Sequence, residues 1–320
     1  MRTTLLHLSA ASLCALAACA DGTGPSSETE PSPAPGIPGL GPLASLAGYR
    51  PFPADNAWNR DVSNDPVDPS SATLIASCGI RNLHPDFGTV WNGAPIGIPY
   101  TTAPGGQPPV TISFYYDDDS DPGEYRIPPD APIEGGSDDH VLVVDRDRCI
   151  LTEVFDATKL SDTAWEAGSG AFFNLSSNAL RTDGWTSADA AGLPILPGLA
   201  RYDEVAAGEI AHALRFTAQR TQGAYIWPAR HEASSITDPN APPMGARVRL
   251  RSDIDVSGYP AQVRVILVAP QRYGMFLADN GSNWYMSGAP DSRWNNDTLR
   301  RFSEIKGHML EFVDDAGAGF

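Results

Sequence analysis

Four ionisable side chains stand in stretches of the sequence that otherwise resemble a protein interior. Glu153 alternates with apolar residues in the run 149–155, and His212 lies among apolar residues at 208–216. His140 opens an apolar run, and Asp189 lies in a loop of small residues. Burying such a group without a partner costs several kcal/mol, so each one needs a hydrogen-bonded partner or a function. We therefore take these four residues as the candidate catalytic residues.

These residue types fit the cleavage of a glycosidic bond in two ways. Hydrolysis needs two carboxyl groups, one as acid and one as base or nucleophile, and Glu153 with Asp189 is the first choice. Elimination in a uronic-acid polymer needs a base such as His212 or His140, and a cation that neutralises the substrate carboxylate. The sequence does not decide between the two reactions.

Each of these residues also has a purely structural interpretation. Glu153 could lie on a solvated strand face, and a lone histidine such as His212 is more often a hydrogen-bonded part of the core. Turn formation by Asp138 and Asp139 explains the position of His140 equally well. The loop that holds Asp189 could simply connect two elements.

A second group of residues supplies the aromatic faces and hydrogen-bonding ends that a sugar-binding groove needs. The group consists of Trp185, Arg201, Glu204, Tyr225, Trp227, Arg230 and His231. Arg201 and Arg230 also provide the cation that elimination requires. Tryptophan and tyrosine pack equally well in cores, so the sequence does not separate binding from packing.

No cofactor is expected, because the metal-ligand patterns are incomplete. The histidines in the apolar runs lack the local spacing of a zinc site. Asp117, Asp119 and Asp121 partly resemble a calcium loop, but Pro122 stands where such loops place glycine, and the twelfth position holds no glutamate. Calcium at these aspartates is an alternative to a solvated acidic turn.

The elements that would position these residues are mainly short strands separated by turns. Alternation and apolar runs predict strands at 110–116, 140–144, 149–155, 247–251, 273–278 and 284–286. The strand at 247–251 is expected to be half-exposed. Helical spacing, proline and capping residues predict short helices at 69–76, 260–269 and 297–306.

Two hairpins are expected among these strands, one through 145–148 and one through the Asp-Asn-Gly-Ser turn at 279–282. Many short strands with abundant glycine and proline predict an all-β fold, a β-sandwich or jelly roll with a few short helices. Residues 49–320 are long enough to form it as a single domain.

The first 48 residues predict export and a tether. Residues 1–18 combine an early arginine, a short apolar stretch and small residues before Cys19, which is the layout of a bacterial lipoprotein signal peptide. Cys19 would carry the lipid, and the Pro-, Gly- and Ser-rich segment 19–48 would hold the domain away from the membrane. An ordinary signal peptide or an uncleaved anchor is the alternative.

Two cysteines remain after the lipid anchor, Cys78 and Cys149. In an exported protein such a pair most often forms a disulfide, which here would close a loop of roughly 70 residues. A reactive thiol is the alternative.

The net charge of −17 limits the partners of the protein. Nucleic acids and anionic membrane surfaces would repel such a surface, so neither is expected to bind. The expected partner is a polysaccharide or other glycan, with contact to the membrane only through the lipid anchor. The protein is expected to be a monomer.

Three segments resemble a group of exported bacterial β-rich proteins of unassigned activity. They are 208–214, with the sequence GEIAHAL, the segment 192–199, and 273–281, which begins YGM and ends DNG. The resemblance covers about residues 135–300 and implies a shared domain without implying a mechanism. It draws attention to His212 without assigning its role.

Together these observations predict a surface-tethered, carbohydrate-active enzyme that cleaves glycosidic bonds in a polysaccharide, as a glycoside hydrolase or as a lyase. The alternative is a non-catalytic lipoprotein that binds glycans or envelope partners through its aromatic residues. A third possibility is a structural domain in which every polar residue named above is satisfied internally.

Overall fold

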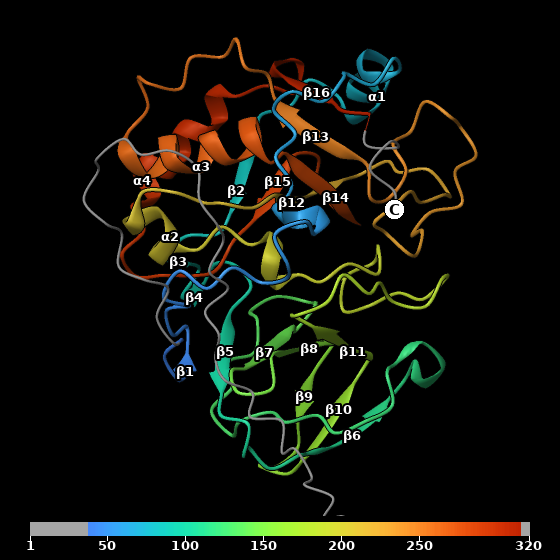
Figure 1. Cartoon of the computed structure of the whole chain (residues 1–320), viewed down its shortest axis with the longest axis vertical. Coiled ribbons are helices and arrows are strands. Elements are labelled where there is room, and N and C mark those ends of the chain that lie inside the picture. Colours follow the sequence, from blue (N-terminus) through green and yellow to red (C-terminus); the bar gives the residue numbers. More distant parts are fainter. Residues whose placement is uncertain (1–37, 315–320) are drawn as a thin grey trace, which may run out of the picture.

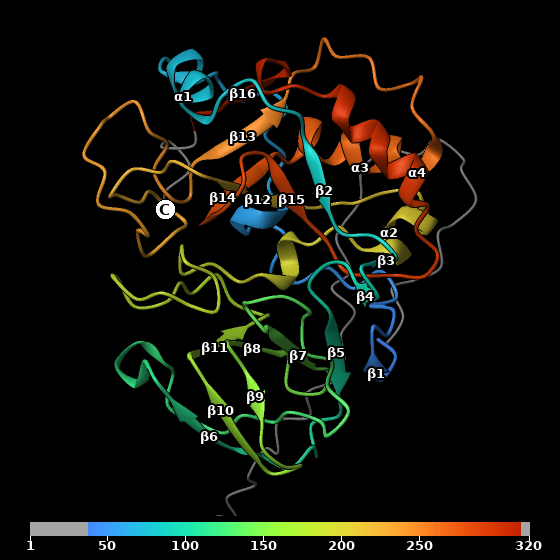
Figure 2. The same cartoon turned by 180° about the vertical axis from the view of Figure 1, so that it is seen from behind.

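The computed structural model describes residues 38–314 and shows a strand-rich fold with several sheets and a few short helices (Figure 1). The strands gather into two lobes, which we call the β-lobe and the α/β-lobe (Figures 1 and 2). Among residues 38–314 no helix is long and apolar enough to cross a bilayer. The predicted signal peptide at 1–18 and Cys19 lie outside the described residues.

The β-lobe contains a five-stranded and a three-stranded sheet. In spatial order the five strands are β1 (Gly41–Pro42), β5 (Tyr100–Ala103), β7 (Val141–Asp145), β8 (Ile150–Phe155) and β11 (Ser169–Asn174). The smaller sheet has the order β6 (Thr111–Phe114), β10 (Ala164–Ala167) and β9 (Thr158–Lys159). The predicted hairpin through 145–148 is confirmed, because β7 and β8 pair antiparallel.

The α/β-lobe is built on a six-stranded mixed sheet. Its spatial order is β16 (Leu310–Phe312), β13 (Arg247–Leu250), β14 (Met275–Asn280), β12 (Leu214–Ala218), β15 (Tyr285–Ser287) and β2 (His84–Asp86). The α-helices are α1 (Ser71–Cys78), α2 (Tyr202–Ala207), α3 (Ala261–Arg272) and α4 (Asn296–Leu299). A two-stranded hairpin, β3 (Val90–Trp91) and β4 (Ala94–Pro95), follows β2 directly.

Short 3-10 helices complete the described chain. They are η1 (Ala57–Asn59), η2 (Asp117–Asp119), η3 (Leu196–Gly198), η4 (Arg300–Glu304) and η5 (Gly307–Met309). Of these, η3 lies in the stretch that connects the two lobes (Figure 1).

Alternation along β7 explains why the five-stranded sheet is buried on both faces. Val141 and Val143 join a small apolar cluster shared with the three-stranded sheet. Leu142 and Val144, which point the other way, join the main core together with the α/β-lobe. The two lobes therefore share the main core, and the β-lobe has a second, smaller core between its two sheets.

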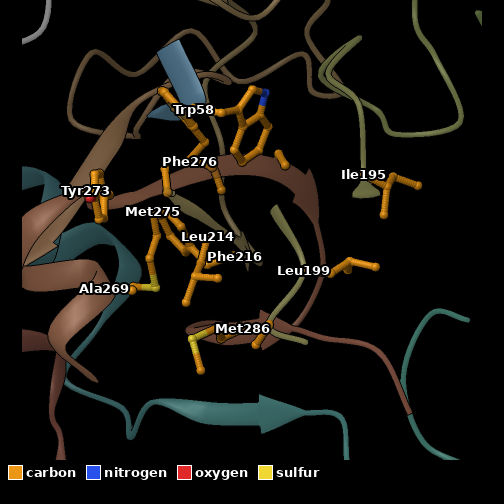
Figure 3. Close-up of a cluster of buried hydrophobic side chains, with 14 of the residues drawn as sticks. Trp58, Ile195, Leu199, Leu214, Phe216, Ala269, Tyr273, Met275, Phe276 and Met286 are labelled. Atoms are coloured by element: carbon orange, nitrogen blue, oxygen red, sulfur yellow. The ribbon is translucent and has the colours of Figure 1, made fainter. Parts of the chain in front are cut away.

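The main core lies on both sides of the six-stranded sheet. The rings of Trp58 and Phe276 meet edge to face with centroids 4.9 Å apart. Figure 3 shows these two rings together, with Met275 of the same strand pointing toward Ala269 of α3. On that strand successive side chains therefore pack against different elements, as a doubly covered sheet requires.

The strand order of the described residues does not match a jelly roll. Parallel pairs join β5 with β7, β6 with β10, β12 with β14, and β2 with β15. Such pairs need long crossover connections, whereas a jelly roll is built from antiparallel strands. The confirmed part of the prediction is the coarser one, a mostly-β fold with several sheets.

The predicted hairpin through 279–282 is wrong, because β12 lies between β14 and β15. The Asn-Gly pair does not form a tight turn between paired strands. Instead the Gly281 N–H donates to the Ala218 carbonyl at 3.1 Å, and the Asn280 side chain accepts from Thr221 at 2.6 Å. A local turn signal was overridden by the insertion of a strand that is distant in the sequence.

The strand predicted at 247–251 exists, but it is buried rather than half-exposed. Arg247 and Arg249 lie inside because their guanidinium groups donate to main-chain carbonyl groups, including those of Ala57 at 2.9 Å and Val62 at 2.6 Å. Alternating arginines therefore indicate backbone-bonding positions here, not a solvated face.

The predicted helices are present with shifted ends. The helix at 69–76 is α1, and the one at 260–269 is α3, which continues to Arg272 with Pro270 inside it. The segment expected to be helical at 297–306 is α4 followed by η4. Helix α2 was not predicted.

The described part of the predicted tether packs on the domain, which corrects the boundary at residue 48. Strand β1 pairs with β5, and Leu46 is buried in the main core. The Asp203 carboxylate accepts from the Ser45 hydroxyl at 2.9 Å and from the Leu46 N–H at 3.1 Å. Residues 38–48 therefore belong to the folded body.

Cys78 and Cys149 are both free thiols, so the structure does not contain the expected disulfide. The physical reason is their position, because Cys78 ends α1 in the α/β-lobe and Cys149 precedes β8 in the β-lobe (Figure 1). Burial raises the pKa of the Cys78 thiol to about 12, which leaves it unreactive at neutral pH.

Candidate functional site

Glu153 is completely buried on the face of β8 that looks toward the α/β-lobe. Its carboxylate accepts the backbone N–H groups of Ile195, at 3.0 and 2.8 Å, and Leu196, at 2.9 Å. Burial raises the pKa of Glu153 to about 7 although both N–H groups favour the ionised form. The side chain thus ties the start of η3 to the five-stranded sheet.

Asp189 is 1% exposed and forms a two-pronged ion pair with Arg215 of β12. Nε of Arg215 donates to one carboxylate oxygen at 3.0 Å, and Nη2 donates to the other at 2.7 Å. The remaining Arg215 nitrogen, Nη1, donates to the hydroxyl of Ser287 on the neighbouring strand β15. Burial raises the pKa of Asp189, and the charge and hydrogen bonds of Arg215 oppose that rise. The ion pair fixes the 185–195 segment on the sheet.

His140 is also buried and bridges two segments. Its Nδ1 lies in a short hydrogen bond with Glu134, and its Nε2 lies 2.9 Å from the Ala188 carbonyl oxygen. Burial by itself lowers the pKa of His140, but the bond to Glu134 and its charge outweigh it, so the pKa is raised. Both nitrogens therefore act as donors of an imidazolium.

Glu153, Asp189 and His140 belong to one group of charges between the lobes. The charges of Asp189 and His140 both act on Glu153, and the charge of His140 acts on Asp189. We call the group of Glu134, His140, Glu153, Asp189, Arg215, Asp279 and Ser287 the interlobe cluster. Residues from strands of both lobes meet in it.

His212 does not join that cluster. It is 1% exposed; its Nδ1 lies 2.7 Å from the Ala213 carbonyl oxygen, and its Nε2 lies 3.1 Å from Glu204. Arg201 is equally buried and bonds to Glu204, to the Leu196 carbonyl at 2.9 Å and to His212. The predicted binding residues Arg201 and Glu204 therefore form, with His212, a closed core network, and His212 precedes β12 instead of lying in a strand.

Three of the predicted binding residues, Trp185, Tyr225 and Arg230, come together around the 181–185 segment. Asp183 pairs with Arg230 at 2.8 Å and accepts from the Tyr225 hydroxyl at 3.0 Å. Trp185 lies under the Arg181 guanidinium, 5.7 Å from its ring centroid. The remaining two are His231, whose Nδ1 lies 2.9 Å from the Ala190 carbonyl oxygen, and Trp227, which is half-buried against the main core.

Sequence reasoning missed Asp279, the carboxyl group of the interlobe cluster that is partly exposed and also has a strongly raised pKa. Asp279 lies near the carboxyl end of β14, beside the parallel strand β12, and it is half-buried. Burial, followed by the negative charge of Asp189, raises its pKa to about 7, while Arg215 opposes the rise. Ligands of sheets with parallel strands bind at such carboxyl ends, and this signal was hidden by the hairpin expected there.

Glu134 is the second accessible carboxylate of the cluster. Its side chain is 16% exposed and is held by the bond to His140. Near it in charge is Asp86, at the carboxyl end of β2: its own burial raises the pKa of Asp86, the charge of His84 opposes the rise, and the charge of Glu134 adds to it. Glu134 and Asp86 therefore make this part of the surface acidic, beside the exposed His84.

Asp121, one of the three aspartates considered for calcium, has other partners in the described chain. Asp121 is engaged by the Arg181 guanidinium and by the Phe172 N–H at 2.8 Å. Within residues 38–314 no group of three or more histidine, cysteine, aspartate or glutamate side chains is arranged to hold a metal ion. The turn is instead tied to Arg181.

Two surface pockets lie away from the interlobe cluster. One, of about 360 Å³, lies between α2 and α3 and is lined by apolar residues such as Val205, Ile210 and Val265. The other is a polar pocket of about 20 Å³ beside Arg201 and Asp203, large enough for about one water molecule. Neither of these two pockets is lined by a residue of the interlobe cluster.

Comparison of the chain with protein-family models, with curated proteins and with solved structures finds no match.

We expect Glu153→Gln to flatten the dependence of stability on pH. The pKa of Glu153 is about 7 when folded, above the ordinary 4.5, so the folded state holds the extra proton between these values. Its contribution to the free energy of unfolding is full below about pH 4.5 and is lost as the pH rises through about 7. Urea unfolding at pH 5 and pH 7.5 measures the slope in wild type and variant.

Glu124→Gln is the matched control, because the Glu124 side chain is 60% exposed. It should keep the slope of the wild type. Equal slopes for Glu153→Gln and the wild type would show that folding does not raise the pKa of Glu153.

Proposed function

We propose that the protein hydrolyses glycosidic bonds in a neutral glycan, with Asp279 as the proton donor and Glu134 as the second carboxylate. The observation that carries the proposal is the position of Asp279, a partly accessible carboxyl group at the end of a buried strand, beside Asp189 and Arg215. Its raised pKa keeps a large fraction protonated near neutrality, as a general acid requires.

Glu153 and Asp189 support the site from behind in this proposal. Both are buried, and their oxygens are taken by backbone N–H groups and by Arg215. They therefore differ from the pair expected from the sequence, in which they touch the sugar themselves. Their proposed role is to position the 185–196 segment and, through the charge of Asp189, to raise the pKa of Asp279.

The contacts favour hydrolysis over elimination. Arg201 is buried in its own network, and Arg230 is paired with Asp183, so neither candidate cation is available to a substrate carboxylate. The accessible carboxylate of the cluster, Glu134, and the nearby Asp86 would repel a uronic-acid polymer. A neutral glycan meets no such repulsion.

The proposed reaction transfers one proton at each end. The Asp279 carboxyl gives its proton to the glycosidic oxygen as the bond from that oxygen to the anomeric carbon breaks. A water molecule bonds to the anomeric carbon and gives a proton to Glu134. The products are a new reducing end and a free hydroxyl group, and proton exchange with water restores both carboxyl groups.

The setting of this activity is part of the proposal. Export, a lipid on Cys19 and the resulting attachment to the cell envelope would place the site where polysaccharides occur. The five- and three-stranded sheets would act as a small sandwich that gives His140 and Glu153 a rigid base.

Release of reducing ends tests the proposal directly. Purified protein is incubated with neutral polysaccharides (β-1,4-glucan, β-1,3-glucan, xylan and galactomannan) and with polygalacturonate and alginate. We expect new reducing ends from at least one neutral polymer and no absorbance of unsaturated uronic acids from the last two. Unsaturated products would favour elimination, and binding without any cleavage would favour the non-catalytic glycan-binding alternative.

A further inference from the structure

The β3–β4 hairpin presents a tryptophan to solvent next to the interlobe cluster. Trp91 is 69% exposed and Val90 is 53% exposed, whereas most large apolar residues of the described chain are buried. A single exposed apolar residue needs no explanation by itself. The position of Trp91 is what distinguishes it.

The hairpin is short and its base is fixed. Asn92 and Gly93 form the turn with positive φ angles of 49° and 87°, the conformation that two-residue hairpins favour. At the base, the Thr89 N–H donates to the Asn296 side chain at 3.0 Å, and the Gly88 N–H donates to the Ile96 carbonyl at 3.2 Å. The turn and the contacts at its base fix the backbone that carries the Trp91 side chain.

Register places Trp91 on the face of the hairpin that lies near Gly135. Trp91 pairs directly with Ala94, and directly opposed residues on paired strands project to the same face. The methyl group of Ala94 lies 3.6 Å from where a Cβ on Gly135 would stand, so that face looks toward Gly135. Gly135 is the neighbour of Glu134 in the chain.

We infer that Trp91 is a stacking platform for a neutral sugar ring of the glycan whose cleavage is proposed above. The inference deepens that proposal and rests on it for the identity of the ligand. A flat indole presents an apolar face to the C–H groups of a sugar. The acidic surroundings of Glu134 and Asp86 disfavour an anionic ligand at the same place.

Titration calorimetry with cellohexaose, xylohexaose and mannohexaose as probes tests the inference. We expect the wild type to bind at least one of them, Trp91→Ala to raise its Kd about 3- to 10-fold, and Trp91→Phe to recover most of the loss. Tyr115→Ala is the control, because Tyr115 is equally exposed, at 67%, but follows β6 in the β-lobe. It should leave the Kd unchanged.

The outcomes separate this inference from the proposed reaction. Weakened binding of Trp91→Ala in a protein that cleaves none of the polymers supports the platform and rejects the hydrolase. Cleavage of a polymer with KM and Kd unchanged in Trp91→Ala rejects the platform and leaves the hydrolase standing. Failure of all three hexasaccharides to bind the wild type, or an equal loss in Tyr115→Ala, also overturns the platform.

Discussion

Asp279→Asn is expected to lower kcat on a neutral glycan by about 10²- to 10⁴-fold, because an amide cannot give the glycosidic oxygen a proton. The side chain keeps its size, and the hydrogen bond from the Asn280 N–H, 2.6 Å in the wild type, can still be accepted. KM should therefore change little. Reducing-end assays across a range of substrate concentrations separate kcat from KM.

The pH dependence of wild-type activity should also reflect the proton of Asp279. Burial and Asp189 raise the pKa of Asp279 to about 7, and a proton donor must be protonated to act. Activity should therefore fall as the pH rises through about 7. The residual activity of Asp279→Asn should lose this alkaline limb, because the variant has no carboxyl group to titrate there.

Asp297→Asn is the matched control, because the Asp297 side chain in α4 is 83% exposed and pairs only at the surface, with Arg300. It should keep the kcat and the pH profile of the wild type. If Asp279→Asn also retained wild-type activity, Asp279 would not be the proton donor and the proposed site would be misplaced.

Arg215→Met is expected to lower the free energy of unfolding by about 3–5 kcal/mol, the usual effect of removing one partner of a buried ion pair. The change removes both N–H groups that Arg215 donates to Asp189, which is 1% exposed, and it also frees the Ser287 hydroxyl. Because Asp189 fixes the 185–195 segment between the lobes, the loss should appear in global unfolding. Urea unfolding monitored by circular dichroism measures it.

Two further variants decide how to interpret that loss. Arg301→Met removes a surface pair with Glu304 and should cost about 1 kcal/mol or less. Asp189→Leu combined with Arg215→Met removes both charges and should recover part of the stability lost in the single variant. A loss for Arg215→Met no larger than for Arg301→Met would show that the interlobe ion pair does not hold the lobes together.

Local patterns in the sequence were sufficient for the elements that depend on near neighbours. The β7–β8 hairpin, which places Glu153 in the core, and helices α1 and α3 were predicted close to their observed bounds. The turn at 279–282 failed for a related reason. Its Asn-Gly pair is a real local signal, but whether the strands on either side pair depends on β12, which lies about 60 residues earlier in the chain.

The sequence did not predict which ionisable side chains are accessible to solvent. Glu153 and Asp189 were recognised as polar groups in apolar surroundings, and both do have the partners that burial demands. Those partners are 42 and 26 residues away in the chain, so no local pattern identified them. The same holds for Glu134 and Asp279, which share the interlobe cluster only after the two lobes have packed together.

By itself, the sequence determined that this chain forms a strand-rich body and that certain ionisable groups within it cannot be left alone in an apolar core. The tertiary structure decided which of these groups are closed off by backbone and arginine partners and which stay open to a ligand. The physical reason is that hydrophobic periodicity is written in neighbouring residues, whereas exposure and pKa arise from contacts between strands that are distant in the chain.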